Sequence, residues 1–117
     1  MDEFTETTTV VAGSDGFIAI AVDRKYEDDV GYRSALYVQP GDAAAIADAL
    51  ERFAETRLDQ TVTLADGQLR IFDMAPSQMI NIELERTDDG PHGGYDTMDL
   101  GPGSAAGVVS GLRSTKR

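Results

Sequence analysis

The sequence predicts an α+β protein in which a β-β-β-α unit occurs twice, giving antiparallel sheets and two helices related by a pseudo-twofold axis. Three observations support this prediction. The 117 residues, 41% of them apolar, suffice for one compact domain. Asp-Gly pairs at 15–16 and 66–67 separate strand-like runs, which is typical of tight hairpins. A Pro-Gly turn followed by an Ala-rich segment occurs at 40–50 and again at 102–112.

The repeat is visible as two pairs of similar segments. Residues 37–50 align with residues 99–112 at an offset of 62, and the two Asp-Gly segments align at an offset of 51. An insertion in the loop at 87–95, rich in Asp and Gly, would reconcile the two offsets. We therefore expect units at 1–58 and 59–117 that share one core. The alternative is chance similarity among small, common residues.

Three strands are expected to open each unit. The expected strands are 7–12, 17–22 and 34–38 in the first unit and 60–65, 68–74 and 79–85 in the second. Because the run 17–22 is apolar on both faces, we place it at the centre of a sheet. A further short strand is expected at 96–100, as the hairpin mate of 79–85 and a candidate counterpart of 34–38.

One helix is expected to follow the strands of each unit. The first begins at Asp42, the expected N-cap. Its predicted buried face comprises Ala43, Ile46, Ala47, Leu50, Phe53 and Ala54. The second helix is expected from Ser104 to about Arg113. It contains Gly107 and Gly111, which weaken a helix by about 1 kcal/mol each but allow a neighbour to approach closely.

The composition limits the classes of partner and chemistry. With 21 acidic and 10 basic residues the net charge is −11, which opposes tight binding to a phosphate backbone and favours a basic protein surface. The absence of cysteine excludes disulfides, thiolate metal sites and a cysteine nucleophile. The acidic start lacks the pattern of a signal peptide, and the longest apolar run is too short to span a membrane. We therefore expect a cytoplasmic protein without membrane contact.

Evidence for catalysis is weak. His92 is the only histidine, and its neighbours Asp88, Asp89 and Asp96 could join it in a metal-assisted hydrolase. A solvated loop is the favoured interpretation, because no second histidine or cysteine completes a transition-metal site. We expect a protein that is not an enzyme and has no cofactor or bound metal.

An acidic binding surface is the favoured functional hypothesis. Its candidate residues are Glu27, Asp28, Asp29, Asp48, Glu51 and Glu55. The expected partner is a protein with a basic surface. A homodimer is also expected to be possible, because strands rich in Thr and Val can leave an open sheet edge.

Two resemblances extend these expectations. The segment Val38-x-Pro40-Gly41-Asp42-Ala43-Ala44-x-Ile46-Ala47-x-Ala49-Leu50 resembles small acidic proteins of actinobacteria and their phages. This resemblance implies an actinobacterial or phage-encoded protein, and most of these proteins have no known function. If the protein is phage-encoded, the expected basic partner is a host protein in the host cytoplasm.

The arrangement of strands followed by a helix, occurring twice, is similar to the whirly-type single-strand-binding coactivators. That resemblance implies an alternative function, the binding of single-stranded nucleic acid on a sheet surface. The implied platform residues are Tyr26, Tyr32, Arg33, Tyr37, Arg70 and Phe72. The net charge of −11 departs from this pattern, since stacking without a basic groove gives weak binding.

Overall fold

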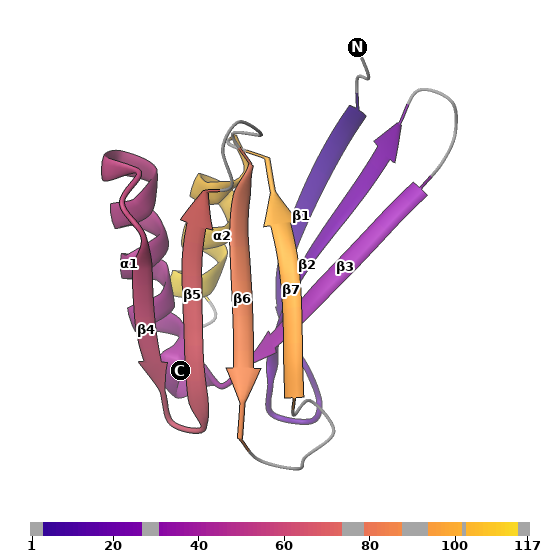
Figure 1. The fold of residues 1–117 in the computed structure, drawn as a ribbon. Coiled ribbons are helices and arrows are strands. Elements are labelled where there is room, and N and C mark those ends of the chain that lie inside the picture. Colours follow the sequence, from indigo (N-terminus) through magenta and orange to yellow (C-terminus); the bar gives the residue numbers. More distant parts are fainter. Residues whose placement is uncertain (1–3, 27–30, 74–78, 88–93, 102, 115–117) are drawn as a thin grey trace.

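The computed structural model describes residues 4–26, 31–73, 79–87, 94–101 and 103–114 (Figure 1). Its elements are β1 (Phe4–Ala12), β2 (Ile18–Tyr26), β3 (Gly31–Val38), the 3₁₀ turn η1 (Pro40–Asp42), α1 (Ala43–Thr56), β4 (Gln60–Leu64), β5 (Gly67–Asp73), β6 (Ile80–Arg86), β7 (Gly94–Leu100) and α2 (Ala105–Ser114). The strands form two antiparallel sheets, ordered β1-β2-β3 and β4-β5-β6-β7. The predicted α+β class, with antiparallel sheets and two helices, is confirmed.

The hairpin signals in the sequence mark real turns. Asp15 and Gly16 join β1 to β2; Gly16 has a positive φ of 89°, and the Asp15 carboxylate accepts a hydrogen bond from the Phe17 amide. Asp66 and Gly67 lie at the turn between β4 and β5. The apolar strand β2 is central in its sheet, as expected, and β6 is the hairpin mate of β7.

The helices cover the inner faces of the sheets in a crossed arrangement. Helix α1, which follows β3, packs against β4 and β5, whereas α2, which follows β7, packs against β1. The two helices also pack against each other, and β3 contacts β7 where the sheets meet. Figure 1 shows both helices behind the four-stranded sheet, with the three-stranded sheet splayed to one side. Side chains from both sheets and both helices therefore share one core, as expected.

Corresponding residues of the two units lie 62 positions apart throughout. The alternating inward side chains of β2 are Ile18, Ile20, Val22 and Arg24, and those of β6 are Ile80, Ile82, Leu84 and Arg86. The meander β1-β2-β3-α1 thus corresponds to β5-β6-β7-α2, and β4 is an additional strand. The expected match between the two Asp-Gly hairpins is wrong, and no insertion is needed. The boundary between 58 and 59 stays a prediction.

Two local details of α1 bear on the predictions. Asp42 is the N-cap residue, as predicted, but its carboxylate makes no capping hydrogen bond to α1 and instead accepts one from the Ala65 backbone. The predicted buried face is wrong at one position. Ala54 is exposed, while Ala49 is buried in its place. The cause is the position of α2, which covers one side of α1 and leaves Ala54 at the edge of the contact.

Candidate functional site

Helix α1 presents three of the predicted binding residues on its exposed side. Asp48, Glu51 and Glu55 lie one or two turns apart and all three are exposed. A guanidinium nitrogen of Arg113, on α2, donates to Asp48 at 2.8 Å and to Glu51 at 2.9 Å. These hydrogen bonds, that to Glu51 first, raise the pKa of Arg113. Two of the three acids are therefore partly neutralised within the chain.

A groove runs between α1 and α2 beside these acids. Its volume is about 620 Å³. Its lining residues are Glu51, Ala54, Glu55, Ala105, Ala106, Val109, Ser110, Arg113 and Ser114. Alanine and valine side chains supply its apolar surface, and Glu51 and Glu55 supply carboxylates at its edge. Such a groove can accommodate an apolar side chain while its carboxylates pair with cations next to that side chain.

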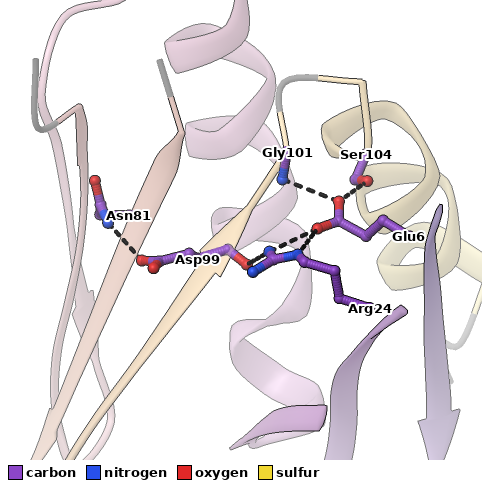
Figure 2. Close-up of polar contacts among 6 residues, drawn as sticks. All are labelled: Glu6, Arg24, Asn81, Asp99, Gly101 and Ser104. Carbon is purple, nitrogen blue, oxygen red and sulfur yellow. Dashed lines mark hydrogen bonds and ion pairs between the residues drawn. The ribbon is translucent and has the colours of Figure 1, made fainter. Parts of the chain in front are cut away.

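A buried ion pair contacts the residues just before α2, the second wall of the groove. Glu6 of β1 accepts hydrogen bonds from Arg24 of β2 at 2.9 and 2.6 Å, and both side chains are only 7% exposed (Figure 2). The second carboxylate oxygen of Glu6 accepts from the Gly101 amide at 2.9 Å and from the Ser104 hydroxyl. Arg24 also donates to the Asp99 carbonyl oxygen at 3.1 Å. The ion pair therefore joins the first sheet to the segment between β7 and α2.

Burial and hydrogen bonding act in opposite directions on Glu6. Burial alone would raise the pKa of Glu6. The hydrogen bonds from Ser104, Arg24 and Gly101 outweigh burial and hold the pKa below its usual value. Glu6 is thus a structural carboxylate that stays ionised near neutral pH, not a candidate acid or base.

A second buried ion pair holds the start of α1 in the same way. Arg86 of β6 donates to Asp66 at 2.8 Å and also to the Tyr37 carbonyl oxygen. Gln39 donates to the same Asp66 oxygen at 3.2 Å. Burial raises the pKa of Asp66, but its bond with Arg86, followed by that from Gln39, lowers it overall. Next to this pair, burial raises the pKa of Asp42.

The two ion pairs are related in part by the same offset of 62. Arg24 and Arg86 correspond, and so do the carbonyl groups that they bind, those of Asp99 and Tyr37. Their acidic partners, Glu6 and Asp66, are 60 positions apart and do not correspond. Each arginine therefore binds the other unit's junction between strand and helix. Reciprocal contacts of this kind are the property of a twofold interface, and they support the predicted pseudo-twofold relationship.

The residues implied for nucleic-acid binding do not form one platform. Arg33 and Tyr37 lie on the outer face of the three-stranded sheet, whereas Arg70 and Phe72 lie on the outer face of the four-stranded sheet. Tyr32 faces inward and its ring lies 5.1 Å from the Arg24 guanidinium. The side chain of Tyr26 lies outside the described residues.

Other predicted candidates also fall outside the described part of the chain. Glu27, Asp28 and Asp29 of the binding surface are among them, as are His92, Asp88 and Asp89 of the loop considered for metal-assisted chemistry. Within the described residues, no group of three or more histidine or acidic side chains is placed to hold a metal ion. The same part of the chain contains no helix with the length and apolar character needed to cross a bilayer.

Reasoning from the sequence missed both buried ion pairs and the groove. The sequence does contain a pattern that predicts burial of the two arginines. Arg24 and Arg86 each extend a run of alternating inward side chains by one step. No comparable signal identifies their partners, which come from other elements. No protein-family model matches this chain, and comparison with curated proteins gives no match.

Proposed function

We propose that the protein is a non-catalytic interaction module that binds a basic protein segment in the groove between α1 and α2. The observation that carries this proposal is the juxtaposition of apolar groove residues with Glu51 and Glu55. In a chain of net charge −11, a cationic partner gains from long-range attraction as well as from direct pairing.

The partner that fits has an apolar side chain flanked by lysine or arginine. Ala54, Ala106 and Val109 offer apolar contact along the groove, while the exposed carboxylate of Glu55 is available for a cation. Glu51 already accepts a hydrogen bond from Arg113, so a partner cation would share or displace that contact. The other predicted acids, Glu27, Asp28 and Asp29, remain candidates for additional attraction.

The experiment is a fluorescence-polarisation titration with a labelled amphipathic peptide of leucine and lysine. The test variant is Glu51→Lys/Glu55→Lys. The matched control is Asp59→Lys/Glu85→Lys, which makes the same change in net charge at exposed acids away from the groove. We expect the test variant to weaken binding at least about tenfold, with a smaller effect in the control. Equal affinities of the two variants would refute docking in the groove.

A second candidate function is the binding of single-stranded nucleic acid on the outer face of β5–β7. The specific observation is that two aromatic side chains lie on that face: the Phe72 ring is 5.0 Å from the Arg70 guanidinium, and Tyr95 is 61% exposed. However, Arg70 is paired with Glu83 at 2.7 Å. Titration with oligothymidylate at about 50 mM salt tests this candidate, because phosphate contacts are strong there. Absence of binding at tens of micromolar protein eliminates it.

A further inference from the structure

The outer edge of β1 lacks a neighbour that its counterpart has. Strand β1 is hydrogen-bonded to β2, and no second strand pairs with it among the described residues. Its counterpart β5 pairs with β6 in the same way but has β4 on the opposite edge. The three-stranded sheet therefore ends at the position where the other sheet has its fourth strand.

The register identifies which groups lie along this edge. The Gly13 amide donates to the Phe17 carbonyl oxygen at 2.8 Å, so these two residues form a hydrogen-bonded pair. Because such pairs alternate along an antiparallel ladder, the odd-numbered residues of β1 bond to β2. The amide and carbonyl groups of Glu6, Thr8 and Val10 therefore point along the sheet, away from β2.

This edge lacks most of the usual features that prevent strand pairing. Strand β1 contains no proline or lysine, and its nine registered pairs with β2 run without a bulge. Its single charge, Glu6, is held by Arg24. In a chain of net charge −11, β1 is thus a charge-compensated segment along which a second copy meets little repulsion.

We propose that β1 pairs with β1 of a second copy, antiparallel and centred on Thr8, so that the two three-stranded sheets join. The side-chain pattern of β1 fits a second copy of β1 as the neighbouring strand. Strand β4, which completes the other sheet, carries exposed Thr61 and Thr63 on its outer face, and β1 carries exposed Thr7 and Thr9 in the same way.

The proposed pairing is self-complementary. Centring on Thr8 places Thr7 opposite Thr9 of the partner, and Thr–Thr pairs across strands are favourable. Twofold symmetry fills both open edges in one contact, so that assembly stops at the dimer. This inference does not rest on the proposed function, because β1 contributes no residue to the groove between the helices.

The experiment is sedimentation equilibrium of the full chain over a range of concentrations at moderate salt, which screens the general repulsion. The test variant is Thr7→Lys/Thr9→Lys, which would place four ammonium groups together on one face of the joined sheet. The matched control is Thr61→Lys/Thr63→Lys on the outer face of β4. Both variants change the net charge from −11 to −9, and circular dichroism checks that each is folded.

We expect a dimer for the natural chain and the control, and a dissociation constant at least about tenfold higher for the test variant. This loss of affinity between the copies could not be caused by the change in net charge, because a smaller negative charge on each copy by itself favours association. Thr8→Pro, which removes an edge amide without touching the ladder to β2, is expected to have the same effect. A monomer at all concentrations would overturn the proposal. So would a dimer that the control dissociates and the test variant leaves intact.

Discussion

Replacing Glu6 by Gln is the sharpest test of how the two units are held together. The substitution keeps the shape of the side chain but removes the charge that compensates Arg24, which is 7% exposed. Removing one partner of a buried ion pair costs about 3–5 kcal/mol, because the other charge remains buried. A domain of this size has a free energy of unfolding of about 5–15 kcal/mol, so the loss is a large fraction of the total.

The measurement is thermal and urea-induced unfolding followed by circular dichroism. We expect Glu6→Gln to lower Tm by roughly 10–20 °C. The control is Asp23→Asn, which removes the partner of Arg33 from an ion pair in the same sheet. In that pair the side chains of Arg33 and Asp23 are 68% and 44% exposed. An exposed pair of this kind contributes at most about 1 kcal/mol.

The pH dependence gives an independent readout. The folded state lowers the pKa of Glu6 from its ordinary value of 4.5, so ionised Glu6 stabilises the fold above that value. This contribution is lost as the pH falls through the lowered pKa. The unfolding free energies of the natural chain and Glu6→Gln should therefore converge below about pH 4.5. A cost below about 1 kcal/mol at pH 7, or a difference independent of pH, would refute the assigned role.

Three further substitutions test the environment of Asp42 and the packing of α2 against β1. Burial and the nearby Asp66 raise the pKa of Asp42 in the folded state, so ionised Asp42 lowers the free energy of unfolding. Asp42→Asn should therefore stabilise the protein at pH 7. This gain should vanish in acid, where Asp42 is protonated. A Cβ added at Gly111 would lie 2.7 Å from Val10, so Gly111→Ala should cost about 1–3 kcal/mol. At Gly107 the nearest atom would lie at 3.3 Å, so Gly107→Ala should change stability by less than about 1 kcal/mol. Urea unfolding measures all three, and equal effects at the two glycines would contradict the packing argument.

Local chemistry made much of the fold predictable. The Asp-Gly turns, the continuous apolar run in β2 and the helical spacing in α1 are each encoded within a few residues, and each was assigned to the correct element. The same local chemistry misled the comparison of the two units. Asp-Gly is favoured in any tight hairpin, so its presence at 15–16 and 66–67 reflects turn geometry, not common position in a repeat.

The candidate site was predictable only in part. Helical spacing was enough to place Asp48, Glu51 and Glu55 on the exposed side of α1. The groove could not be found in this way, because its second wall is α2, which begins 49 positions after the end of α1. For the same reason the ion pair of Asp48 and Glu51 with Arg113 has no local signal.

The contact between Glu51 and Arg113 indicates what duplication makes possible at this site. These two residues are 62 positions apart, so they occupy corresponding places on α1 and α2, and they meet where the helices pack together. In a dimer of identical units the same position would bring two like charges together, which is unfavourable. Two copies within one chain can differ at this position, and here they carry opposite charges at 2.9 Å. The groove beside this pair can therefore be acidic along α1 while the contact between the helices remains attractive.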